Sequence, residues 1–229
     1  LPMLLCVCLT LCSCGSNESA EKPSAASSDT VAKDSSPATT AAAGSRDNTP
    51  VVLTGSADGT VTYGNDSVTV DASHTEEGYL MVSYSGSNSK VKLQITGSDE
   101  ITYTYNLHDG YETFPLTSGS GSYTVGVFEN IEGTSYSTLF TQAIDVTIQD
   151  EFGPYLYANQ YVNFSADSKV ISKAMELSAS ANDDLEVIEN VYNYIITNFT
   201  YDYDKAASVQ SGYLPDVDDV LASQRSEER

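Results

Sequence analysis

Short runs of alternating apolar and polar residues, separated by turn residues, fill residues 49–150. Val91, Leu93 and Ile95 alternate with polar residues, and a period of two places such a set on one face of a β-strand. The same pattern recurs in three further segments, residues 101–107, 123–127 and 144–148. Turn sequences rich in Gly, Asn, Asp and Ser separate the runs at a spacing of roughly ten residues. This pattern predicts a β-sandwich of immunoglobulin-like type.

The periodicity changes after Phe-Gly-Pro at residues 152–154. Ser165 is predicted to cap a first helix, and either Asn182 or Asp183 is predicted to cap a second. The second segment places apolar residues at steps of three and four, which predicts an amphipathic helix. We call this set the apolar stripe: Leu185, Ile188, Tyr192, Ile195 and Phe199. A helix of this length is marginal alone in water, so the stripe requires a partner layer. The predicted fold class is therefore α+β.

The chain is strongly acidic, with 10 Lys and Arg residues against 32 Asp and Glu residues and a formal net charge of −22. Such a charge repels phosphate backbones and anionic lipid surfaces. Nucleic acid is therefore not expected as a partner.

All four cysteines lie within the first 14 residues, at Cys6, Cys8, Cys12 and Cys14. Residues 15–229 therefore contain no disulfide, no thiolate metal site and no cysteine nucleophile. The two Cys-x-Cys pairs could be read as metal ligands, but they sit in an apolar leader with no histidine nearby. We predict no metal and no cofactor.

The apolar run within residues 1–14 is too short for a bilayer span, which needs roughly 20 residues. Its length is typical of a secretory signal peptide, although no basic segment precedes it, so we expect that residues are missing from the front. The sequence LCSCG at residues 11–15 resembles a bacterial lipobox. The resemblance implies cleavage before Cys14 and a lipid anchor on its sulfur, which would tether the protein to the bacterial cell membrane. The alternative is an ordinary signal peptide with incidental cysteines.

Residues 15–48 consist mainly of Ser, Ala, Thr, Pro and Gly and show no apolar periodicity. Such a segment cannot bury enough apolar surface to fold. We predict a disordered tether between the anchor and the β-domain of residues 49–150.

Both histidines, His74 and His108, lie beside turn residues of the predicted β-domain. A Ser/His/Asp triad can be drawn on paper, but no Gly-x-Ser-x-Gly motif accompanies it. Both histidines are therefore predicted to be solvated loop residues. Asp58 and Asp66 are weak candidates for calcium binding, because their spacing is not that of an EF-hand loop.

Two acidic clusters follow the second predicted helix: Asp202 with Asp204, and Asp216 with Asp218 and Asp219. Clustered carboxylates can bind Ca²⁺, but carboxylates at helix starts also interact favourably with the helix dipole. We predict the second role.

The sequence DDLEVIENVYNYIITNFTYDYDKAASVQSGYLPDVDDVLASQR, residues 183–225, resembles the opening of a bacterial transglutaminase-like domain. In that family an amphipathic helix ends in a tyrosine-rich segment, here residues 198–203, and a short helix follows, here residues 216–221. The resemblance covers residues 161–225. It implies that Gly-x-Cys comes next, with the nucleophilic Cys at the head of the central helix and the catalytic His and Asp further on.

Residues 226–229 read Ser-Glu-Glu-Arg instead of the family's Gly-x-Cys. No catalytic residue can therefore be assigned in this chain, and we expect that the sequence is truncated or frame-shifted here. Residues 151–229 are then the N-terminal helical part of an incomplete domain. The apolar stripe should be partly exposed or covered by the β-domain.

These observations predict an extracytoplasmic lipoprotein anchored at Cys14, whose intact form carries out Cys-dependent acyl transfer or peptide hydrolysis. The expected substrates are extracellular protein or peptidoglycan peptide, as the resemblance implies. The alternative is a non-catalytic, surface-anchored binding or adhesion module.

Overall fold

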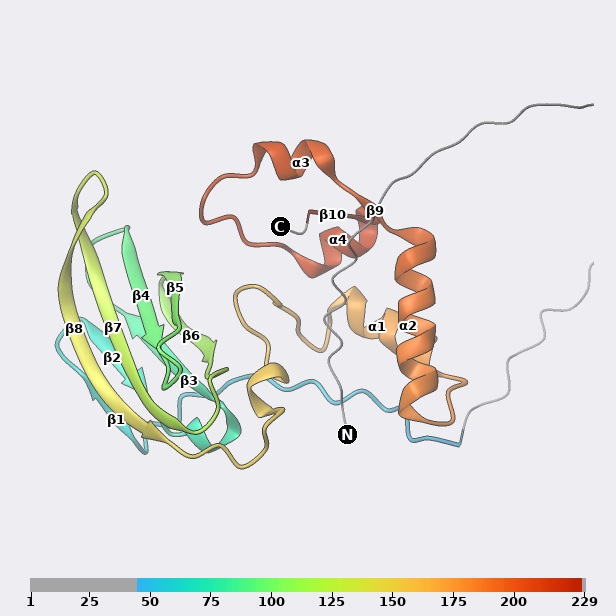
Figure 1. Cartoon of the computed structure of the whole chain (residues 1–229), viewed down its shortest axis with the longest axis horizontal. Helices are drawn as coiled ribbons and strands as arrows, with labels where there is room; N and C mark the ends of the chain where they lie inside the picture. The colour runs from blue at the N-terminus through green and yellow to red at the C-terminus, as the bar shows by residue number, and fades with distance from the viewer. Residues whose placement is uncertain (1–44, 228–229) are drawn as a thin grey trace, which may run out of the picture. The chain divides into compact units, whose positions relative to one another are not determined.

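The computed structural model describes residues 45–227. The predicted signal peptide, the lipid attachment site Cys14 and most of the predicted tether lie outside the described residues. The described part combines antiparallel sheets with a set of helices (Figure 1). Among residues 45–227, none of the helices has both the length and the hydropathy needed to cross a membrane.

Two four-stranded antiparallel sheets form between residues 62 and 146. The first has the order β1-β2-β3-β6, with bounds Thr62–Gly64, Val68–Asp71, Tyr79–Tyr84 and Gly110–Pro115. The second has the order β5-β4-β7-β8, with bounds Thr102–Leu107, Val91–Thr96, Gly121–Glu132 and Ser135–Val146. Neighbouring strands in the first sheet are not all consecutive in sequence, because the chain crosses to the second sheet between β3 and β6.

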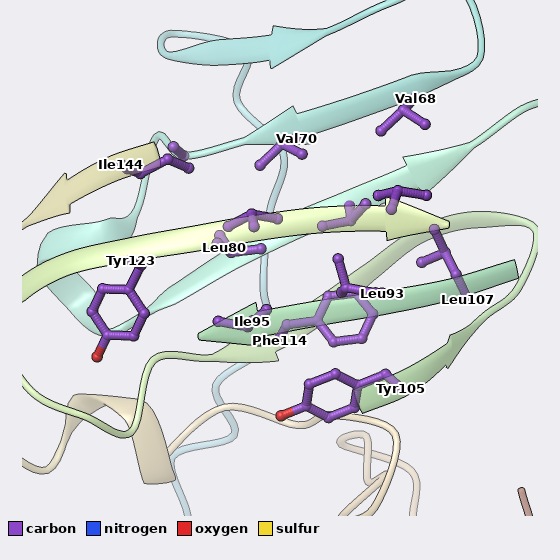
Figure 2. Close-up of a cluster of buried hydrophobic side chains, with 14 of the residues drawn as sticks. Val68, Val70, Leu80, Leu93, Ile95, Tyr105, Leu107, Phe114, Tyr123 and Ile144 are labelled. Carbon is purple, nitrogen blue, oxygen red and sulfur yellow. The ribbon is translucent and has the colours of Figure 1, made fainter. Parts of the chain in front are cut away.

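Side chains from both sheets share one apolar core (Figure 2). Val70 and Leu80 enter it from the first sheet, and Leu93, Val125 and Val127 enter it from the second. Every apolar residue of the predicted runs in β4 and β7 is buried, which confirms the period-two pattern there. Each fully buried aliphatic side chain contributes about 1.5–3 kcal/mol by leaving water.

The predicted run at residues 101–107 only partly reaches the core. Tyr105 and Leu107 are buried, whereas Ile101 and Tyr103 are exposed. Strand β5 is the outer strand of its sheet. Burial raises the pKa of Tyr105 to about 12, which keeps its hydroxyl neutral.

The remaining chain is mainly helical. Short 3-10 turns η1 and η2 occupy Thr75–Glu77 and Gly153–Tyr155. The helices α1 to α4 span Lys169–Ser178, Asp184–Asn198, Tyr203–Ser208 and Val217–Ser223. A two-residue parallel pair joins β9, Thr200–Tyr201, to β10, Arg225–Ser226. Helix α1 packs against α2 and α4.

Helix α2 begins where the sequence predicts. The side chain of Asp183 accepts a hydrogen bond from the amide of Glu186 at 2.9 Å, and the Glu186 carboxylate accepts one from the amide of Asn182 at 2.7 Å. This reciprocal pairing satisfies two backbone amides that the helix itself leaves without acceptors.

The predicted cap of the first helix is wrong, because α1 begins at Lys169 rather than after Ser165. Its first amides, those of Lys169 and Val170, donate to the Asp218 carboxylate at 2.9 and 3.0 Å. A residue of α4 thus caps α1. Local sequence could not reveal this, because the cap comes from a residue 49 positions away.

Candidate functional site

The apolar stripe of α2 is largely open to solvent. Leu185, Ile188 and Tyr192 are 72%, 54% and 58% exposed. Ile195 is also exposed, and Phe199 is half-buried. This confirms the expectation that the stripe is partly exposed. Within residues 45–227, no sheet covers the stripe as a second layer.

The helices enclose an apolar groove of about 970 Å³, and Ile195 and Phe199 at the end of the stripe belong to its wall. Its walls come from α1, α2, α4 and the loop between α3 and α4; they include Val170, Leu177, Val191, Phe199, Val220 and Leu221. Lys173 lies at one side, with its ammonium 5.2 Å from the ring centre of Tyr194. The groove therefore offers mainly apolar surface, and the helices leave their interior incompletely filled.

A small polar group borders the groove, because Tyr213 and Glu227 belong to its lining. Lys205 forms an ion pair with Glu227 at 3.0 Å and a short hydrogen bond with the Tyr213 hydroxyl. These two partners hold the pKa of Lys205 above its ordinary value. Burial raises the pKa of Glu227, but the hydrogen bonds from Lys205 and Tyr213 outweigh it and lower the pKa overall. Oε2 of Glu227 is buried without a hydrogen-bond partner.

The acidic clusters act at helix starts, as predicted. Asp202 accepts a hydrogen bond from the Lys205 amide at 3.0 Å and pairs with Arg225 at 3.2 Å. Asp216 accepts from the amides of Asp218 and Asp219, both at 2.9 Å. Within the described residues, no group of three or more His, Cys, Asp or Glu side chains has a metal-binding arrangement.

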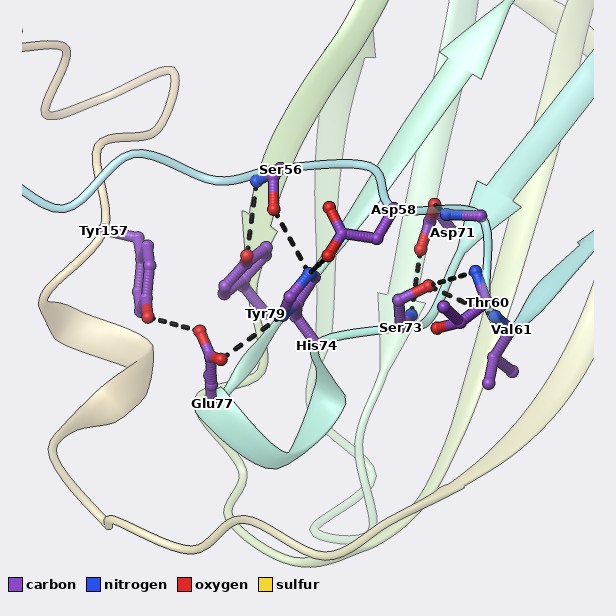
Figure 3. Close-up of polar contacts among 11 residues, drawn as sticks. Ser56, Asp58, Thr60, Val61, Asp71, Ser73, His74, Glu77, Tyr79 and Tyr157 are labelled. Atoms are coloured by element: carbon purple, nitrogen blue, oxygen red, sulfur yellow. Dashed lines mark hydrogen bonds and ion pairs between the residues drawn. The ribbon is translucent and has the colours of Figure 1, made fainter.

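A cluster of polar contacts surrounds His74 (Figure 3). The ring atom Nε2 lies 3.0 Å from Asp58 Oδ2 and 3.2 Å from Ser56 Oγ, and Nδ1 lies 3.3 Å from Glu77 Oε1. The imidazole stacks on the Tyr79 ring, with centroids 5.3 Å apart and an interplanar angle of 9°.

The prediction that His74 is a solvated loop residue is wrong, because its side chain is only 19% exposed. Partial burial lowers the pKa of His74, but its contacts with Glu77 and Asp58 outweigh this and raise the pKa above 6.5. Glu77 follows His74 by three residues, but Ser56 and Asp58 come from another segment that meets His74 only in the fold, so the local sequence does not reveal the complete cluster.

His74 lies between Ser56 and Glu77, as the histidine of a hydrolase triad lies between its serine and its carboxylate, but the remaining contacts do not fit that chemistry. A general base needs a neutral ring nitrogen directed at the serine hydroxyl. Here Asp58 faces the same nitrogen, so both ring nitrogens face carboxylates and the charged imidazolium is favoured. The Ser56 amide donates to the Tyr79 hydroxyl at 3.2 Å.

His108 and Asp66 behave differently from His74. The His108 side chain is 54% exposed, which confirms the prediction of a solvated residue, and its Nδ1 lies 3.2 Å from Glu112 Oε2. Asp66 is exposed in the turn between β1 and β2. Asp58, the other weak calcium candidate, pairs with His74 instead.

Comparisons of this chain with protein-family models, with curated proteins and with solved structures gave no significant match.

Proposed function

We propose that residues 151–229 are the N-terminal helical part of a transglutaminase-like domain. In this proposal an immunoglobulin-like sandwich carries that domain, and a lipid on Cys14 anchors the protein outside the bacterial cell membrane. The intact protein performs Cys-dependent acyl transfer or peptide hydrolysis on extracellular protein or peptidoglycan peptide. The present chain has no cysteine after Cys14 and so lacks the nucleophile.

The observation that carries the proposal is the open apolar stripe beside the groove. Burying apolar surface stabilises a protein by roughly 25 cal/mol per Å², and exposed apolar surface lacks this stabilisation. A helix face this apolar therefore favours a further layer that covers it. The described residues supply helices on one side of α2, but no strand layer for the stripe. In the family that residues 183–225 resemble, the chain continues into a central helix and a β-sheet.

Two features support the immunoglobulin-like assignment of the sandwich. Strands β2, β3 and β6 share one sheet and β5, β4, β7 and β8 the other, an arrangement that agrees with a Greek-key sandwich. Near the start of β7, the Tyr123 hydroxyl lies 3.0 Å from the carbonyl of Leu116 and 2.7 Å from that of Gly119. A tyrosine that bonds back to the preceding corner is typical of such sandwiches.

The decisive experiment extends the chain. The coding DNA is read past Arg225 in all frames, and the longer protein is compared with the present chain. We expect a Gly-x-Cys motif and a later histidine, thiol-dependent turnover that iodoacetamide abolishes, and weaker binding of the dye ANS because the stripe is covered. The Cys→Ser variant of the new residue is the matched control and should keep the low ANS binding. A stop in every frame would contradict the proposal and favour a binding module. Turnover by the present chain would contradict the proposal without favouring a binding module.

The anchor is tested separately by expression in a bacterial host with metabolic labelling by a fatty acid. We expect the label in the wild type and in Cys12→Ser, but not in Cys14→Ser. Mass spectrometry of the mature N-terminus should begin at Cys14. Label retained by Cys14→Ser would exclude this attachment site.

A further inference from the structure

Three segments far apart in the sequence meet at the η1 turn. We call residues 53–58 the strap and residues 153–158 the connector. Leu53 and Tyr157 form a parallel bridge, and the Ala158 amide donates to the Leu53 carbonyl at 3.3 Å. The connector also packs closely against the turn. A Cβ added to Gly153 would lie only 2.4 Å from the Glu77 carbonyl oxygen.

His74 supplies the charged link between these segments (Figure 3). It contacts Asp58 of the strap at 3.0 Å and Glu77 of the turn at 3.3 Å. The other carboxylate oxygen of Glu77 accepts a hydrogen bond from the Tyr157 hydroxyl of the connector at 2.5 Å. A protonated imidazole donates from both ring nitrogens, so it satisfies both carboxylates at once. A neutral imidazole can donate to only one of them.

The other titratable groups around His74 favour its charged form or stay neutral. Asp71 of β2 is buried; burial opposes its ionisation, but hydrogen bonds from Ser73 and Gly59 hold its pKa below the ordinary value. Its negative charge attracts His74. Burial and Glu77 raise the pKa of Tyr157, so it remains a donor at neutral pH.

We propose that His74 is a pH-sensitive clasp: protonated, it joins Asp58 of the strap to Glu77 of the η1 turn, which in turn holds Tyr157 of the connector, and neutral, it gives up one of the two carboxylates and loosens this link. The clasp is fully closed below about pH 6.5, the ordinary value for histidine. It loosens as the pH rises through the higher value that His74 has in the folded protein. The strap leads back to residues 45–48, where Arg46 pairs with Asp184 at the start of α2 at 2.8 Å.

Hydrogen exchange of the full chain tests the clasp, with the amides of Ser56 and Ala158 as reporters. The first donates to Tyr79 and the second to Leu53, so each reports on one fastened segment. Between pH 6 and pH 8.5, after correction for intrinsic exchange, we expect their protection to fall about threefold to tenfold, the range that corresponds to the loss of one ordinary hydrogen bond. Amides within β4 should not change.

Two variants and one control decide the outcome. His74→Gln keeps a polar side chain but no charge, and it should show low protection at both pH values. Asp58→Asn removes an exposed partner without touching the core, and it should lose most of the pH dependence. His108→Gln replaces the only other histidine and should behave as the wild type. Equal protection of the wild type at both pH values, or an unchanged pH dependence in His74→Gln, would overturn the clasp.

Discussion

The sandwich buries most of its apolar side chains, whereas the helical region leaves many of its apolar side chains exposed. The apolar faces of β4 and β7 meet the opposite sheet, so residues such as Leu93 and Val125 are completely removed from water. In the helical region, α2 packs its other side on α1 but leaves Leu185 and Ile188 exposed. The difference shows that regular secondary structure does not ensure a core: two apolar layers must face each other.

The largest expected effect tests this difference directly. Leu93→Ala in β4 should lower the free energy of unfolding of the sandwich by about 2–5 kcal/mol, because it removes buried atoms and leaves a cavity. Leu185→Ala in α2 makes the same chemical change at an exposed site, and we expect a change within about 0.5 kcal/mol. Urea denaturation followed by circular dichroism measures both. Similar losses in the two variants would mean that the stripe is covered in solution.

A smaller effect concerns a single hydroxyl group in the sandwich. Tyr123→Phe removes the hydroxyl that lies against the Leu116 and Gly119 carbonyls, and we expect a loss of about 0.5–1.5 kcal/mol. Tyr103→Phe on the exposed part of β5 is the matched control and should change stability by less than about 0.5 kcal/mol. The same denaturation experiment compares them. A neutral Tyr123→Phe would show that the corner contributes no stability.

The smallest effect is local to the helical region, where α1 depends on a cap from α4. Asp218→Ala should speed hydrogen exchange at the Lys169 and Val170 amides severalfold, whereas Asp219→Ala at the exposed neighbour should not. The Lys169 amide and the other contacts lower the pKa of Asp218 below 3.8. Its contribution is therefore present above that pH and is lost as the pH falls through the lower folded value. Exchange that is insensitive to Asp218→Ala would show that α1 starts without this cap.

Patterns that depend on neighbouring residues were predictable from sequence. The alternation in β4 and β7, the apolar stripe of α2 and a cap at Asn182 or Asp183 all follow from spacing of a few residues. The exposure of the stripe was expected for another reason, the missing partner layer. The incorrect start at Ser165 and the solvated reading of His74 have one shared cause. In both cases the decisive partner, Asp218 or Asp58, comes from another segment of the chain.

By itself, the sequence determined the two periodicities, the acidic charge and the confinement of every cysteine to residues 1–14. These are properties of composition and local backbone geometry, which need no knowledge of the fold. Only the tertiary structure decided which sheet each strand joins, which carboxylate caps α1 and that His74 links the strap to the η1 turn. Such contacts require the closure of long loops, which costs conformational entropy. They form only when packing elsewhere in the fold brings the segments together.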